Sequence, residues 1–319
     1  TVTVGSGVTG LSLQAYTGGG QGAIYSADVT PDADNYSFLT NSTSSYINAA
    51  TGVLTRVANA TVTNVTSTGL AVTGTITSTA GITIGSLDIG HGAGGATNTA
   101  VGTDALDNSH ASATNNTAIG NNALIGTHTA ATLYNTAVGS KAGEAITSGN
   151  INTFVGYAAG DATLDGVGNT GVGANALGAD CADGNTAVGR NALHTFTGSN
   201  ATAVGYGAAD SATTADGITA VGISALQALN HADSDNNTAI GAWSSDALEG
   251  ASSAGHSNTA VGAYSFSTSV DGNQNVAVGK SALHTGDCGN DNVAVGYNSL
   301  LVFTGSSATA IGSGAADLA

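Results

Sequence analysis

The stretch Asn98-Thr99-Ala100-Val101-Gly102, followed by Ala105-Leu106, decides the fold because it recurs with small changes to the end of the chain. Aligned on its glycine, the motif occurs thirteen times, at Gly102, Gly120, Gly139, Gly156, Gly173, Gly189, Gly205, Gly222, Gly241, Gly262, Gly279, Gly296 and Gly312. The spacing runs from 16 to 21 residues and averages 17.5, or 210 residues in twelve steps. A period this short and this sustained predicts a solenoid in which each repeat forms one coil.

The repeat also predicts which side chains line the coil. Alternate side chains of a strand point to opposite faces, so Val101 and Thr99 share one face and Ala100 takes the other. Because the residue before the glycine is Val or Ile in every copy, we expect this face to point inward. We expect the Ala row, in which Phe154 is the exception, to face another copy of the chain. The inward face is expected to be closed by Leu106, Leu124, Leu177, Leu193, Leu226, Leu283 and Leu300, with Phe266 in one coil. The repeat glycine is expected to take a positive φ at the corner after the strand.

The composition agrees with a thin, repetitive molecule. The 319 residues include 48 Gly and one Pro, with 8% charged and 5% aromatic residues. This does not describe an ordinary enzyme. The hydrophobic content of 41% comes mainly from Ala and Val. We therefore expect an interior of small side chains stacked in rows.

The charge of the chain excludes several partners. Four Lys and Arg against 21 Asp and Glu give a formal net charge of −17. Phosphate contacts need Lys and Arg, so we expect no binding to nucleic acid or to an anionic membrane. No run approaches 18 consecutive apolar residues, so we expect no membrane insertion. An acidic surface suits a location outside a cell or on a virion.

The chain is expected to contain three regions. Residues 1–59 read as a β-rich N-terminal module, in which Thr1–Val4 and Val8–Leu13 alternate like strands. Residues 60–97 read as a Thr- and Gly-rich β shaft, because β-branched residues alternate with Thr and Ser between turn glycines. Such strands have too little apolar surface to fold alone. Residues 98–319 form the β-roll repeat domain.

The motif resembles the head repeat of the YadA-like trimeric autotransporter adhesins. The matching positions include Thr99-Ala100-Val101-Gly102, Thr117-Ala118-Ile119-Gly120 and Val276-Ala277-Val278-Gly279. The resemblance implies an all-β fold, a left-handed parallel β-roll of about 13 coils, associated as a homotrimer. Similar repeats occur in phage tail fibres, and the segment at 60–97 resembles their intertwined shafts. The coils here are longer and less uniform than those of the adhesin family, and the neck, stalk and anchor of that family are absent from this chain.

These observations leave three functions open. The first is a trimeric fibre subunit, a phage tail fibre or related virion appendage that acts as a rigid spacer and attaches to a host-surface glycan or protein. The second is a bacterial adhesin or extracellular filament subunit, and the third is a polysaccharide-cleaving spike. Ice binding is a further possibility because threonine rows on flat solenoids can bind ice. The expected inward position of the repeat Thr argues against it.

No residue pattern indicates catalysis. Glycosidase chemistry needs two carboxyl groups at a set separation, and the only glutamates, Glu144 and Glu249, lie in different loops without an evident partner. We therefore expect no enzyme activity, no catalytic residues and no cofactor. Calcium could bind the Asp-rich loops through oxygen ligands, although solvated turn aspartates are the simpler interpretation. These loops contain Asp161 and Asp165, Asp180 and Asp183, Asp233 and Asp235, and Asp287 and Asp291.

Three residues remain to be assigned. Trp243, the single tryptophan, could stack on a sugar as a surface recognition residue or fill a local bulge. Cys181 and Cys288 lie six coils apart, about 29 Å at roughly 4.8 Å per coil. That separation exceeds the roughly 7 Å limit for a disulfide, so we expect two free or buried thiols.

Overall fold

The computed structural model describes residues 97–316, apart from 108–109, 111, 130–131, 230–233, 247–254 and 268–271, together with four short strands nearer the N-terminus. The chain divides into two units, residues 1–83 and 84–319, and each is described by itself. Within the described parts of the chain, no helix is long and apolar enough to cross a membrane.

The first unit contains a small antiparallel sheet. Its strands pair in the order β1-β2-β3-β4 and have the bounds Leu11–Tyr16, Gln21–Ser26, Phe38–Thr40 and Ser45–Ile47. The boundary predicted for the β-rich N-terminal module, residues 1–59, stays a prediction. The strand predicted at Thr1–Val4 and residues 60–96 of the predicted shaft lie outside the described residues.

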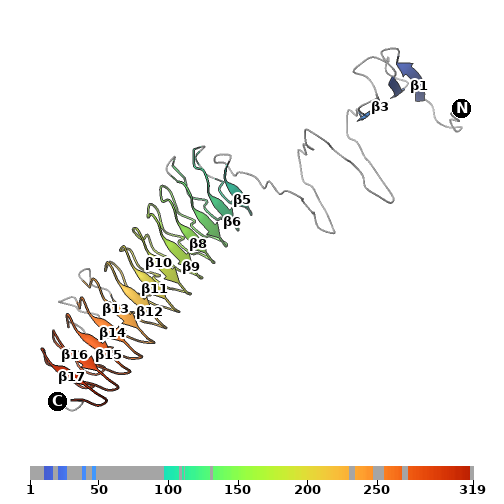
Figure 1. The fold of residues 1–319 in the computed structure, drawn as a ribbon. Helices are drawn as coiled ribbons and strands as arrows, with labels where there is room; N and C mark the ends of the chain where they lie inside the picture. Colours follow the sequence, from blue (N-terminus) through green and yellow to red (C-terminus); the bar gives the residue numbers. More distant parts are fainter. Residues whose placement is uncertain are drawn as a thin grey trace. The chain divides into compact units, whose positions relative to one another are not determined.

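The second unit is a parallel β-solenoid of thirteen three-residue strands, one per repeat (Figure 1). The strands lie in sequence order in a single sheet, so each pairs only with its neighbours in the chain. They are β5 Thr99–Val101, β6 Thr117–Ile119, β7 Thr136–Val138, β8 Thr153–Val155, β9 Thr170–Val172, β10 Thr186–Val188, β11 Thr202–Val204, β12 Thr219–Val221, β13 Thr238–Ile240, β14 Thr259–Val261, β15 Val276–Val278, β16 Val293–Val295 and β17 Thr309–Ile311. The predicted all-β solenoid is confirmed.

The coils stack without any shift in register. Thr186, Ala187 and Val188 pair with Thr170, Gly171 and Val172 in the preceding coil, and the same correspondence holds along the whole sheet. Because the side chains of a parallel sheet stack at the strand spacing of roughly 4.8 Å, each motif position forms a straight row. The solenoid therefore presents rows of nearly identical side chains.

The row that points into the coil is the Ala row, and the prediction that Val and Thr point inward is wrong. Ala118, Ala137 and Ala187, at the centres of their strands, have no exposed surface, whereas the Thr and Val on either side are partly or largely exposed. The reason is the thickness of the coil. The Leu row occupies the space behind the strand, which leaves room for only a methyl group opposite.

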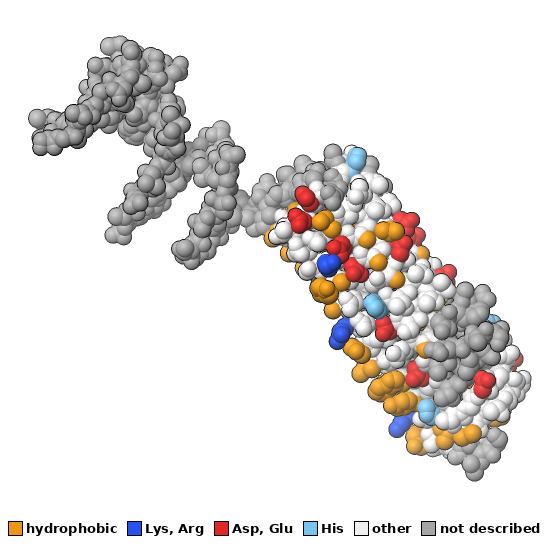
Figure 2. Space-filling view, turned by 180° about the vertical axis from the view of Figure 1, so that it is seen from behind, with side chains coloured by type: hydrophobic (Ala, Val, Ile, Leu, Met, Phe, Trp, Pro, Cys, Tyr) orange, Lys and Arg blue, Asp and Glu red, His pale blue; other side chains and the backbone are white. Residues whose placement is uncertain are grey.

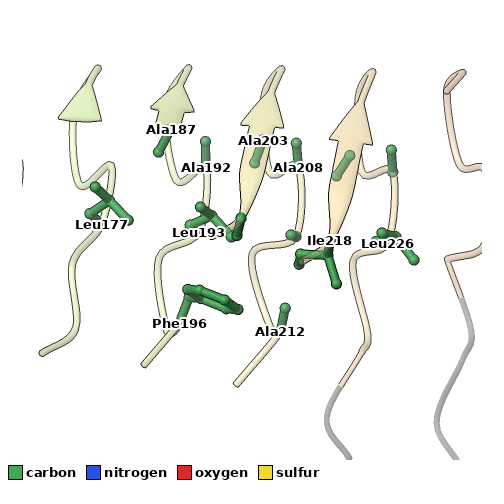
Figure 3. Close-up of a cluster of buried hydrophobic side chains, with 14 of the residues drawn as sticks. Leu177, Ala187, Ala192, Leu193, Phe196, Ala203, Ala208, Ala212, Ile218 and Leu226 are labelled. Atoms are coloured by element: carbon green, nitrogen blue, oxygen red, sulfur yellow. The ribbon is translucent and has the colours of Figure 1, made fainter. Parts of the chain in front are cut away.

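The interior consists of small side chains in rows with one larger row, as the composition predicted. Figure 3 shows Leu177 and Leu193 in successive layers and Leu226 two layers beyond Leu193, with Ala187 and Ala203 on the strands beside them. All the predicted closing residues are buried: Leu106, Leu124, Leu177, Leu193, Leu226, Leu283, Leu300 and Phe266. The core is thus continuous along the solenoid and only a few side chains thick.

The repeat glycines have the predicted positive φ, between 126° and 140°. A second constraint was not predicted. A Cβ placed on Gly205 would lie 2.4 Å from the carbonyl oxygen of Gly222, and the first twelve repeat glycines approach the next coil in the same way. Glycine is required at the corner both for its φ and because consecutive coils are in backbone contact there.

Candidate interaction surface

The outer strand face is defined by the two outward rows of β5–β17, the Thr or Val that begins each strand and the Val or Ile that ends it. Alternation places both rows on the side opposite the buried Ala row. The exposed fraction reaches 39% at Ile119, 41% at Ile240 and 73% at Ile311. Because the Ala row is internal, it does not face another copy of the chain as expected, and the Val and Ile row is the one on the outside.

The outer strand face contains no ionisable side chain in either row. The chain has 21 Asp and Glu, and none of them occupies either row in any of the thirteen coils. Figure 2 shows hydrophobic side chains gathered along one long edge of the solenoid, with Lys and Arg at intervals beside them. Extended apolar surfaces of this kind mark interaction sites in soluble proteins.

Larger side chains continue this surface at the position after the repeat glycine. Tyr157, Tyr206 and Tyr297 are each more than half exposed, and Ile223 is 48% exposed. The Arg190 guanidinium lies over the Tyr206 ring, 5.8 Å from its centroid. Aromatic rings and Arg are the side chains that protein interfaces favour.

A ladder of buried asparagines, which was not predicted from the sequence, holds successive coils together. Asn sits four residues before the repeat glycine in ten of the thirteen coils. The Asn152 Oδ1 accepts a hydrogen bond from the backbone N–H of Asn169 at 2.8 Å, and its Nδ2 donates to the carbonyl of Gly166 at 2.8 Å. Asn169 is bound in the same way to Asn185 and Ala182. Each amide thereby satisfies buried backbone groups of two segments.

Three of the Asp residues considered as calcium ligands instead accept hydrogen bonds between coils. The side chains of Asp180, Asp183 and Asp235 accept backbone N–H groups of Leu164, Val167 and Asp216 at 2.7 to 2.8 Å. Asp233 lies outside the described residues. Among the side chains that the structure describes, no group of three or more His, Cys, Asp or Glu is placed to hold a metal ion. Whether the chain binds calcium stays a prediction.

Of the two glutamates considered for glycosidase chemistry, the structure describes Glu144 alone. Glu144 forms an ion pair with Lys141 at 3.0 Å, and Glu249 lies outside the described residues. Asp161 occupies the position of Glu144 in the next coil. Burial raises the pKa of Asp161, and the nearby Glu144 carboxylate raises it further. The ion pair with Lys141 holds Glu144 in place.

Both cysteines are buried and neither forms a disulfide, as predicted. Burial raises the pKa of the Cys181 thiol, whose sulfur lies 3.4 Å from the Thr163 hydroxyl. A protonated, buried thiol is unreactive. Cys181 therefore serves as a small core residue.

Trp243 lies at the second position after its repeat glycine and stacks on Tyr264, which occupies the same position in the next coil. The ring centroids are 5.3 Å apart and the planes differ by 9°. Both side chains are 37% exposed. Trp243 is therefore partly exposed and packs on Tyr264, a residue that was not singled out from the sequence.

No protein-family model, curated protein or solved structure matches this chain. The resemblance to adhesin heads and tail fibres rests on the repeat motif and, for tail fibres, also on the segment at 60–97. What the structure shows is the parallel β-solenoid, with its outward Thr and Val rows.

His128 is expected to make the solenoid sensitive to mild acid. Burial lowers its pKa from 6.5 to about 4. Between these two pH values His128 is therefore neutral in the folded chain and protonated in the unfolded chain. Stability is then lost as pH falls from about 6.5 to about 4, by up to about 3 kcal/mol. Thermal unfolding at pH 7 and pH 4.5 measures this loss. The His128→Gln variant should lose less stability over the same interval, and an equal loss in both proteins would contradict the prediction.

Proposed function

We propose that the chain is a structural subunit of a homotrimeric fibre, a phage tail fibre or related virion appendage, in which the β-roll is left-handed. The observation that supports it is the outer strand face, whose two uncharged rows leave the Val or Ile that ends each of the thirteen strands at least partly exposed. The fibre acts as a rigid spacer and attaches to a host-surface glycan or protein. Its location is the virion surface or the outside of a cell.

A second copy of the same chain is the partner that fits this face best. Another solenoid carries the same rows at the same spacing of roughly 4.8 Å, so apolar rows can meet along their full length. Rotational symmetry closes such an assembly and buries the face of every copy. The three-fold number comes from the resemblance to adhesin heads. Three copies also multiply weak contacts with a host surface through avidity.

A bacterial adhesin or extracellular filament would use the same solenoid and the same association. Neighbouring genes separate this assignment from a virion appendage. A polysaccharide-cleaving spike is the third assignment, and incubation with capsule polysaccharide tests it through the release of oligosaccharides. We expect no release.

The oligomeric state tests the proposal directly. We expect the native mass of the full chain to equal three copies, and Val188→Lys with Val204→Lys to convert the trimer into monomers. Both valines are 37% exposed, so a solenoid can carry lysines there, but apposed copies would have to bury the charges at a cost of several kcal/mol. Thr214→Lys is the matched control, because Thr214 is exposed and lies outside the strands. A monomeric parent chain would overturn the proposal.

Ice binding is the second candidate, and the outward Thr row favours it. Eleven of the thirteen strands begin with Thr. Ice binding was disfavoured because these Thr residues were expected to point inward, but they lie on the outer strand face. A monomer would leave a flat, regular array of Thr hydroxyl and Val methyl groups open to water. Observation of ice crystals growing in the protein solution decides between the two: a trimer that buries the face should not slow their growth.

A further inference from the structure

We propose that the stacked rings of Trp243 and Tyr264, with the polar side chains of the adjacent row, form a binding site for a neutral glycan. The inference deepens the attachment role proposed above by assigning it a place and a ligand class. It concerns a surface beyond the glycine corner, separate from the outer strand face.

The fold does not need aromatic rings at this position. The second residue after the repeat glycine is Asn in several coils, among them Asn122, Asn175 and Asn191, and these coils close with the same left-handed backbone, at φ between 56° and 58°. At the level of the two rings, the interior is filled by Ala239, Ala260 and Phe266. Trp243 and Tyr264 therefore add exposed apolar surface to a coil that is already closed.

The stack consists of two rings. The backbone N–H of Trp243 donates to the carbonyl of Ile223 at 2.9 Å, and that of Tyr264 donates to the carbonyl of Ala242 at 3.0 Å. The backbone hydrogen bonds between successive coils thus continue through both residues. The same position holds Ser224 in the preceding coil and Ser281 in the following one. A two-ring platform matches the apolar C–H faces of one or two sugar rings.

A row of polar side chains runs parallel to the rings, five residues after each repeat glycine. It contains Asp246, Ser267 and His284 in three successive coils. His284 meets Tyr264 edge-on, at 5.6 Å between centroids and 65° between planes, and its Nδ1 lies 2.7 Å from the Ser267 hydroxyl. The His284 ring therefore links the exposed Tyr264 ring to the buried Ser267 hydroxyl.

Asp246 supplies one carboxylate oxygen, Oδ1, that no described residue engages. Its Oδ1 is buried and has no hydrogen-bond partner among the residues the structure describes. Burial also raises the pKa of this carboxyl, and the nearby His284 lowers it. A buried acceptor without a donor is costly, and a sugar hydroxyl is a donor of the right kind.

The combination selects the ligand class. A pyranose has an apolar C–H face that stacks on aromatic rings and hydroxyl groups around its edge that bind carboxylate, imidazole and hydroxyl groups. Asp246 and the net charge of −17 disfavour an anionic glycan. The site therefore suits neutral hexose or pentose units.

The single tryptophan makes the site directly measurable, because all tryptophan fluorescence of the chain comes from Trp243. The full-length protein is titrated with neutral gluco-, galacto-, manno- and xylo-oligosaccharides while the emission is recorded. We expect a saturable change with at least one of them, and Tyr264→Ala to weaken it about tenfold. Trp243→Ala should abolish retention on the same sugar immobilised on a resin. Tyr134→Ala, which removes an exposed ring in a distant coil, should bind like the parent chain.

No saturable change with any of these sugars up to about 10 mM, or equal binding by the parent chain, Trp243→Ala and Tyr264→Ala, would overturn the assignment. The native mass of each variant is measured alongside. Loss of sugar binding by a chain that remains trimeric would leave the fibre proposal standing, whereas sugar binding by a monomer would contradict the fibre and support the site.

Discussion

Gly205→Ala is expected to destabilise the solenoid by about 4 kcal/mol or more, which is the range of exceptional single substitutions. The added Cβ would lie 2.4 Å from the carbonyl oxygen and 2.7 Å from the carbonyl carbon of Gly222, and neither backbone atom can move without separating two coils. The φ of 140° adds strain for any residue with a side chain. Chemical unfolding followed by circular dichroism measures the loss.

Gly207→Ala is the matched control, two residues away in the same coil. Gly207 has a φ of 60°, and the nearest atom to an added Cβ is the Ser224 hydroxyl at 3.6 Å. Ala158 occupies the equivalent position in another coil with a φ of 50°. We expect a loss of no more than about 1 kcal/mol. Equal effects of the two substitutions would show that close packing of the coils at the corner is not what requires glycine.

The second large effect concerns Phe154, the one large residue in the Ala row. It fits because glycine replaces the usual Leu at Gly160 and the usual Ala at Gly171. A Cβ on Gly160 would lie 2.5 Å from the Phe154 ring, and one on Gly171 would lie 3.1 Å from it. We expect Phe154→Ala to cost about 3 to 5 kcal/mol by leaving a cavity. Gly160→Leu alone should be destabilising through overlap with the ring.

The double variant Phe154→Ala with Gly160→Leu restores the arrangement of most other coils, Ala on the strand and Leu behind it. It should be more stable than the sum of the two single losses by about 2 to 3 kcal/mol. Gly160→Leu combined with Phe196→Ala, a buried ring two coils away, should show additive losses. Additivity in both pairs would rule out the exchange of volume between Phe154 and Gly160.

The periodicity of the sequence was enough to predict the coils, their number and the burial of the Leu row. It was not enough to orient the strands. Alternation divides Thr99, Ala100 and Val101 between two faces but does not say which face is inside, and the invariance of Val suggested burial. In a thin coil the opposite holds, because Leu106 fills the space behind the strand and only the Ala100 methyl fits opposite it.

The Asn ladder had a signal that could have been used. A polar residue that recurs immediately before a strand, as Asn98, Asn116 and Asn135 do, indicates a repeated hydrogen bond in the interior. The left-handed backbone of the Leu row had no such signal. Leu106 and Leu124 have φ values of 54° and 50°, which Leu rarely adopts, and only the packing of the coil determines them.

Of the site around Trp243, only the tryptophan itself was predicted from the sequence. A single tryptophan in a chain poor in aromatics indicated possible recognition, but its stacking with Tyr264 could not be predicted because unequal loops separate the two residues. They align because each is the second residue after its repeat glycine, Gly241 for Trp243 and Gly262 for Tyr264. The polar row of Asp246, Ser267 and His284 becomes visible only through the same count.

The bonding between coils bears on how such a chain changes during evolution. Each coil contacts only its two neighbours, and it does so through the same strand register, glycine corner and, in most cases, Asn hydrogen bonds. A duplication of one complete repeat, such as the 17 residues that separate Gly156 from Gly173, would insert a coil whose upper and lower surfaces already match. The molecule can therefore change length in whole steps of roughly 4.8 Å, while its cross-section stays constant.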